Sequence, residues 1–171
     1  MGMPAEEIPV TMECAGNSRT SVYPPAEGLQ FNHGAVGTAV WKGIPLASLL
    51  ARAGVDGSAV EVLFEGADSG EEEEEGEELH ISYERSLPLK DALDPGVLVA
   101  FEMNRQPLEP SHGFPIRLIV PGWYGMASVK WLTRITLLRE PFKGFFQDRR
   151  YVYISEGETA STPWEPVSRL V

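Results

Sequence analysis

Two apolar runs separated by a Pro-Gly step restrict this chain to a fold of short strands joined by structured loops. Residues 116–120 (IRLIV) are apolar apart from Arg117, and residues 132–138 (LTRITLL) form the second run. Pro121 and Gly122 end the first run, because proline has no N–H for a strand ladder and glycine permits a sharp change of direction. We therefore predict two strands that flank an irregular loop.

This loop and the turn before it carry several hydrogen-bond donors. An imidazole, a guanidinium, a hydroxyl and an ammonium group come from His112, Arg117, Ser128 and Lys130. Donors of these kinds on a rigid scaffold suit an anion with several oxygen atoms. The alternative is a plain hairpin with a core histidine and solvated charges, and these residues alone leave both interpretations open.

The composition is that of one globular domain. The chain has 171 residues, of which 43% are hydrophobic, and this is enough for a sizeable core. Seventeen glycines and fourteen prolines favour turns and short strands over long helices. No apolar run approaches the roughly 20 residues that span a bilayer. The N-terminus lacks the basic and apolar blocks of a signal peptide, so we expect a cytoplasmic protein.

The formal net charge of −11 argues against nucleic acid or an anionic membrane as the partner. Much of this acidity is local, since residues 71–78 contain seven glutamates. Like charges packed so closely repel one another, and we predict a solvated loop between two strands. Adventitious binding of a divalent cation is one alternative, and the role of this acidic run is left open.

Periodicity predicts most of the remaining elements. Alternating apolar residues indicate strands at 8–14, 60–64 and 79–83, and a continuous apolar run indicates a central strand at 97–103. A helix is expected at 45–53, with proline in its first turn and glycine as its cap, and one helical turn at 86–93.

Three other segments are expected to be irregular. Residues 34–39 are small, so that backbone could lie close to a ligand there. Residues 139–153 are aromatic and basic, which is typical of a loop that covers a sheet. Residues 155–171 are polar and rich in proline, and we expect a linker or tail.

Cys14 is the single cysteine and lies on the apolar face of the first predicted strand, at the end of that strand. A lone cysteine in such a place is usually an inert core residue. Two features favour another interpretation. Ala15 and Gly16 leave room for a large group beside the sulfur, and a nearby Arg19 would favour a thiolate. A thiolate with one free coordination direction suits a soft metal that brings its other ligands with it.

Four segments carry a resemblance to a known family. They read CAGNSR at 14–19, GAVGTAVW at 34–41, FEGAD at 64–68 and HGFPIRLIVPGWYGMASVKWLTRI at 112–135. Together they resemble the sulfite oxidase family of molybdenum enzymes, and the resemblance extends over about residues 10–153. It implies a mixed α/β (α+β) catalytic domain at residues 1–154, with mixed sheets, short helices and long loops.

The resemblance also implies a cofactor and roles for particular residues. Cys14 would be the thiolate ligand of molybdenum, Tyr151 would orient the substrate, and Arg19 would attract an oxyanion. Mo-molybdopterin would be held by Asp68, His112, Arg117, Ser128, Val129 and Lys130. The expected reaction is oxygen-atom transfer to or from a small oxyanion, first of all sulfite. The electron acceptor would be external, because no heme-binding segment is present.

The sequence departs from the family pattern in three places. Only thirteen residues precede Cys14, so part of the family's N-terminal portion is expected to be missing, as is its immunoglobulin-like dimerisation domain. Phe31 replaces a tryptophan common in sulfite-oxidising members, and Ser18 replaces an arginine. Two competing hypotheses are therefore a truncated pterin-binding module without catalysis and an inactive apo fragment of a longer enzyme. The oligomeric state is left open.

Overall fold

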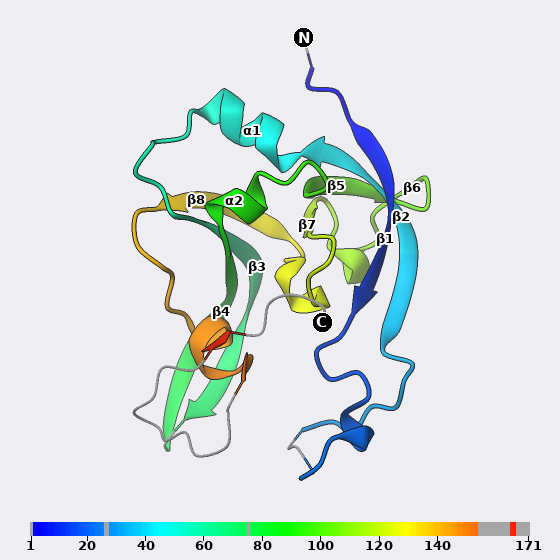
Figure 1. Ribbon diagram of the computed structural model, residues 1–171, viewed down its shortest axis with the longest axis vertical. Helices are drawn as coiled ribbons and strands as arrows, with labels where there is room; N and C mark the ends of the chain where they lie inside the picture. Colours follow the sequence, from blue (N-terminus) through cyan, green and yellow to red (C-terminus); the bar gives the residue numbers. More distant parts are fainter. Residues whose placement is uncertain (1, 26–27, 75, 154–164, 167–171) are drawn as a thin grey trace.

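The computed structural model describes residues 2–25, 28–74, 76–153 and 165–166 (Figure 1). Its body consists of two antiparallel sheets. Sheet A has five strands, which are β1 (Glu6–Glu13), β2 (Val36–Pro45), β5 (Leu98–Met103) and β6 (Gln106–Pro107) in this order, with β7 (Arg117–Ile119) also paired to β5. Sheet B has three strands in the order β4 (Glu77–Pro88), β3 (Glu61–Glu74) and β8 (Leu132–Leu138).

Short helices connect these sheets. Helix α1 (Leu46–Ala53) leads from β2 to β3, and α2 (Leu89–Ala92) leads from β4 to β5. The expected helix at 45–53 is confirmed, with Pro45 just before it and Gly54 at its end with φ of 88°. The turn expected at 86–93 is shorter than predicted, because residues up to Pro88 pair with β3 and continue β4.

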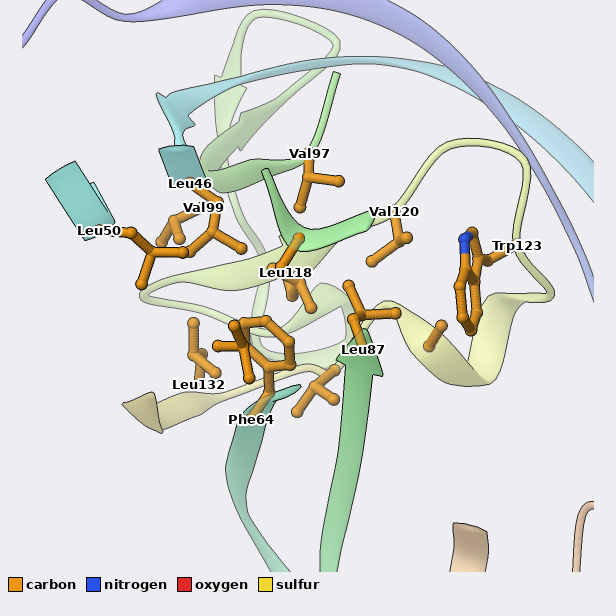
Figure 2. Close-up of a cluster of buried hydrophobic side chains, with 14 residues drawn as sticks. Leu46, Leu50, Phe64, Leu87, Val97, Val99, Leu118, Val120, Trp123 and Leu132 are labelled. Carbon is orange, nitrogen blue, oxygen red and sulfur yellow. The ribbon is translucent and has the colours of Figure 1, made fainter. Parts of the chain in front are cut away.

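The core lies on both faces of sheet A. One cluster fills the space between the two sheets, and Figure 2 shows Leu46, Phe64, Leu87, Leu118, Val120 and Leu132 pointing into it. A second cluster, on the other face, contains Val10, Ala39, Trp41, Leu98, Ala100, Leu108 and Ile119. Successive residues of a strand face opposite sides, so a strand buried on both faces must be apolar throughout. The central strand expected at 97–103 is confirmed.

The segment 112–132, called the junction below, crosses from one sheet to the other. Its two predicted strands are confirmed, but β7 belongs to sheet A and β8 to sheet B. Backbone hydrogen bonds from Leu118 N to Val129 O (2.8 Å) and from Leu132 N to Ile116 O (3.0 Å) hold the loop against β7. The plain-hairpin interpretation is therefore wrong.

The acidic run is a pair of strands in the described residues, and the prediction of a loop there is wrong. Glu71 pairs with His80 and Glu72 with Leu79, so that β3 and β4 form one long hairpin. Strand pairing satisfies the backbone, and an ion pair from Arg150 to Glu72 (2.6 Å) offsets part of the charge, while His80 Nδ1 is hydrogen-bonded to Glu71 Oε1 at 2.7 Å. Residue 75 lies outside the described residues.

Strand β2 was not predicted, because small residues at 34–39 hide its alternation. It pairs with β1 on one side and β5 on the other. A Cβ at Gly43 would collide with the backbone of Val99, so that glycine permits the close approach of β2 and β5.

The segment expected to be a covering loop at 139–153 contains a π-helix (Phe145–Arg149) and β9 (Val152–Tyr153). Strand β9 pairs with β10 (Glu165–Pro166). The rest of the expected tail at 155–171 lies outside the described residues. Within the described residues, none of the helices has the length and apolarity that a membrane span requires.

Candidate active site

A pocket of about 580 Å³ lies where the junction meets the end of β1 and the middle of the β3–β4 hairpin. Its walls come from the end of β1, from β3, β4 and the junction, and from the segment after the π-helix. The lining residues are Met12, Glu13, Cys14, Ala15, Asp68, Tyr83, Arg117, Gly125, Met126, Ser128, Lys130 and Tyr151. Six of the nine residues assigned from the sequence are among them: Cys14, Asp68, Arg117, Ser128, Lys130 and Tyr151.

Cys14 follows β1 directly, and its side chain is exposed rather than buried on the apolar face of that strand. The alternative of an inert core cysteine is therefore excluded. The backbone of Cys14 is fixed by a hydrogen bond from its N–H to Ala35 O (2.9 Å), and Gly16 N–H donates to the sulfur at 3.4 Å. A fixed, accessible thiol in a pocket wall is suitable for coordination of a soft metal.

Arg117 is a buried cation, with 6% of its surface exposed. Its Nη1 donates to His112 O (3.0 Å) and its Nη2 to Ser128 O (2.8 Å), while the guanidinium carbon lies 5.0 Å from the centre of the Trp41 ring. Burial lowers the pKa of Arg117 to about 10. Among the described residues no carboxylate forms an ion pair with it, so a ligand anion in the pocket would supply the missing counter-charge.

Ser128 and Lys130 are the residues before and after Val129 in the sequence, and both line the pocket. The Oγ of Ser128 accepts a hydrogen bond from Val120 N (3.0 Å), and Lys130 Nζ donates to Ser111 O (3.1 Å) above the Trp131 ring. Val129 does not line the pocket, because alternation points its side chain into the core between the sheets. Its contribution is the carbonyl that binds the backbone of β7.

Asp68 reaches the pocket through a bulge in β3. The register of β3 with β4 shifts between Glu65 and Ser69, and such bulges redirect side chains. A Cβ at Gly66 would collide with Asp68 Oδ1 where it lies in this structure, so glycine leaves room for the Asp68 carboxylate at this place. Asp68 Oδ1 is buried and has no hydrogen-bond partner in the described part of the chain. A buried carboxylate oxygen without a donor is costly, which indicates that a ligand donates to it.

Two tyrosines form another part of the pocket wall. Tyr151 lines the pocket beside Tyr83, whose hydroxyl donates to Met126 O (2.8 Å). Burial raises the pKa of Tyr83, so this phenol stays neutral. Tyr83, Met12 and Met126 were not assigned from the sequence. Tyr83 and Met12 lie on predicted strands, but periodicity does not show that these two strands contribute to the same pocket.

Arg19 and His112 do not line the pocket. Arg19 Nη1 donates to Leu29 O (3.1 Å), in the loop after β1. The His112 side chain is partly exposed, with Nδ1 4.0 Å from Glu109 Oε2, and it is the His112 carbonyl that binds Arg117. The site therefore receives a main-chain contribution from His112 and no direct contact from Arg19.

Comparison with known proteins places this architecture in one family. A family model described as oxidoreductase molybdopterin binding domain matches residues 1–146. Mitochondrial sulfite oxidases of Macaca fascicularis and Homo sapiens are each 41% identical over 170 residues, which are 96% of this chain and 29% of each relative. Nitrate reductase (NADH) of Solanum lycopersicum is 38% identical over 155 residues, 84% of this chain and 16% of the relative.

A solved structure confirms the expected fold. The sulfane dehydrogenase SoxCD of Paracoccus pantotrophus superposes with a TM-score of 0.73 at 31% identity, over 88% of this chain and 36% of that chain. The chain thus spans about 29% of the length of the sulfite oxidases it matches. The expected Mo-molybdopterin cofactor is confirmed at the level of the family. With most of its length matched by the family model, the chain belongs to the oxidoreductase molybdopterin-binding domain family.

Proposed function

We propose that this chain is the cofactor-binding core of a molybdenum oxidoreductase that transfers an oxygen atom to or from a small oxyanion, with sulfite as the first candidate. One observation carries the proposal. A single pocket contains an exposed thiol, a buried guanidinium without a carboxylate partner among the described residues, and a buried carboxylate oxygen without a donor. The relatives named sulfite oxidase and nitrate reductase support an oxyanion as substrate.

The donor set of the pocket suits a pterin that carries phosphate and a dithiolene-held metal. Arg117 and Lys130 would neutralise the phosphate, and the Ser128 hydroxyl would bind its oxygens. Asp68 would accept from an N–H of the pterin, which removes the cost of its unpartnered oxygen. Cys14 would supply the protein's thiolate to molybdenum.

When bound, the cofactor supplies the two-electron centre and the oxygen atom that is transferred. The chain's own residues bind, orient and shield. Tyr151 would orient the oxyanion with its phenol, and Met12 and Met126 would keep water from the pocket walls. Arg19 would attract the oxyanion by its charge from outside the pocket, and it would contact the oxyanion directly only if its guanidinium left the Leu29 carbonyl. The electron acceptor would be a separate molecule.

The second candidate is a pterin-binding module, or an apo fragment of a longer enzyme, that does not catalyse. Two observations favour it: the chain spans about 29% of the length of the sulfite oxidases it matches, and the Arg19 guanidinium donates to a loop carbonyl outside the pocket. The cytoplasmic location and the domain boundary at residue 154 remain predictions.

Molybdenum per chain, measured by elemental mass spectrometry on protein expressed with added molybdate, separates these candidates. We expect about one metal per chain and sulfite-dependent reduction of a dye, with Cys14→Ala as the control that abolishes turnover. Metal without turnover on sulfite, nitrate or a sulfoxide would support the binding module. A well-folded protein without metal would support the apo fragment.

A further inference from the structure

Arg85 is a buried cation behind the pocket wall that takes no part in the function proposed above. Only 1% of its surface is exposed. It lies two residues after Tyr83 on β4, so both side chains point to the same side of that strand. Its Nη1 donates to the carbonyl of Phe146 in the π-helix, and its guanidinium carbon lies 6.0 Å from the centre of the Tyr151 ring.

The surroundings of Arg85 connect it to both pocket tyrosines. The Tyr83 ring is 4.9 Å from the Phe146 ring, and the Phe146 ring is 6.4 Å from the Tyr151 ring. Burial of a guanidinium costs free energy, and burial lowers the pKa of Arg85. A carbonyl acceptor and an aromatic face offset part of this cost, since the ring quadrupole attracts a cation.

Other contacts hold the earlier part of the same segment. Gln147 Nε2 donates to Ser86 Oγ (2.9 Å), and the Phe142 N–H donates to Glu61 Oε2 (2.9 Å). These contacts end four residues before Tyr151. Closer to it, Arg150 pairs with Glu72 (2.6 Å) at the surface, where an ion pair contributes little, and its guanidinium carbon lies 5.3 Å from the centre of the Phe145 ring. Arg85, by contrast, is almost fully buried, and its guanidinium lies against the Tyr151 ring.

We propose that Arg85 is a positioning residue for Tyr151, which holds residues 145–151 against β4 and thereby sets where the Tyr151 phenol lies in the pocket. The proposal rests on the proposed function, in which Tyr151 orients the oxyanion. Arg85 acts through this ring and through the Phe146 carbonyl, without contact with cofactor or substrate.

The kinetic test is a double-mutant cycle between Arg85 and Tyr151 in the molybdenum-loaded protein. Arg85→Met should lower kcat/KM for sulfite by about tenfold at unchanged molybdenum content, because a misplaced orienting group loses rate without loss of cofactor. In the Tyr151→Phe background the same substitution should cost less than about twofold, since the phenol it places is already absent. Arg85→Lys should restore part of the activity, because it keeps the cation.

Arg150→Met is the matched control, since it removes an exposed arginine next to Tyr151 by the same substitution. It should leave kcat/KM within about twofold of the unsubstituted protein. Two results would overturn the proposal. One is a loss of kcat/KM from Arg85→Met that is as large in the Tyr151→Phe background as with Tyr151 present. The other is a loss from Arg150→Met as large as that from Arg85→Met.

A second readout does not depend on cofactor. In cofactor-free protein, hydrogen–deuterium exchange of a peptide covering residues 145–151 should become clearly faster in Arg85→Met and change less in Arg150→Met, because Arg150 loses only surface contacts, with Glu72 and the Phe145 ring. A peptide covering β8 should be unchanged in both. Unchanged exchange at 145–151 in Arg85→Met rejects the proposal. If loaded protein shows no turnover, the proposed function fails, while the exchange experiment still decides whether Arg85 places this segment. If Arg85→Met does not fold, Arg85→Lys is compared with Arg150→Lys in the same way.

Discussion

Two walls of the pocket differ in how deeply their side chains are buried in the protein. The junction, residues 112–132, contributes buried groups, and Arg117 and Ser128 are hydrogen-bonded to backbone within it. The thiol loop, here residues 14–25 and 28–35, projects from the end of β1 and the start of β2 and carries an exposed Cys14 (Figure 1). Tyr23 and Leu29 of this loop are also exposed. Arg117 and Ser128, two of the groups assigned to holding the cofactor, are thus built into the core, whereas the group assigned to the metal is not.

The largest effect on turnover without an effect on stability is expected from Cys14→Ser in the thiol loop. Turnover should fall below detection, because an alcohol does not replace a thiolate as a ligand to a soft metal. The free energy of unfolding should stay within ~0.5 kcal/mol, since the side chain is exposed. Sulfite-dependent dye reduction and urea unfolding measure the two effects. Unchanged turnover would show that Cys14 is not the metal ligand.

Arg117→Met in the junction should affect both fold and cofactor. The free energy of unfolding should fall by about 2–3 kcal/mol, because the carbonyls of His112 and Ser128 lose their buried donor. Molybdenum per chain should fall about tenfold as the phosphate loses its buried cation. Urea unfolding and elemental mass spectrometry are the measurements. Lys42→Met is the control, since Lys42 pairs with Glu102 away from the pocket.

Cofactor retention should decrease as the pH rises through about 10. Burial lowers the pKa of Arg117 to about 10 in the folded protein, from an ordinary value of 12.5. Between these values the unfolded chain binds more protons than the folded one, so the contribution of Arg117 to the free energy of unfolding rises with pH. The folded protein nevertheless loses the charge that holds the phosphate. Release of cofactor with the fold intact is therefore expected.

Pterin fluorescence in a filtrate, with circular dichroism of the retained protein, measures this release. Lys130→Met is the control. Arg117 and Lys130 are the two cations assigned to the phosphate, and this variant keeps Arg117. The midpoint of release should be the same in this variant. A midpoint that disappears in Lys130→Met would contradict the assignment to Arg117.

The weakest effect is expected from Arg19→Gln, also in the thiol loop. Its guanidinium binds the Leu29 carbonyl and does not line the pocket. We therefore expect kcat/KM for sulfite to fall by less than about threefold, and this loss should become smaller still at high salt, which screens the charge. A loss above tenfold would show that Arg19 moves into the pocket when the cofactor is bound. Thr20→Ala, at the neighbouring exposed position, controls for disturbance of the loop.

Local sequence patterns were sufficient for some elements and for much of the site. Proline and glycine at the two ends of α1 predicted this helix, and the strand that became β8 was predicted with its observed bounds. They were misleading where small or charged residues hide a strand, as in β2 and in the acidic ends of β3 and β4. In these places backbone pairing, which satisfies N–H and C=O groups whatever the side chains, overrides local preference.

The sequence by itself determined the family, the thiol, and the order in which the cofactor-binding groups occur, because these depend on residue identities and short spacings. Tertiary structure alone decided that β7 and β8 belong to different sheets, that a bulge turns Asp68 into the pocket, and that Arg85 lies against a segment 61 residues away. The physical reason is that these features depend on contacts between segments far apart in the sequence. A periodicity of two or of 3.6 residues indicates a strand or a helix but not the segment against which it packs.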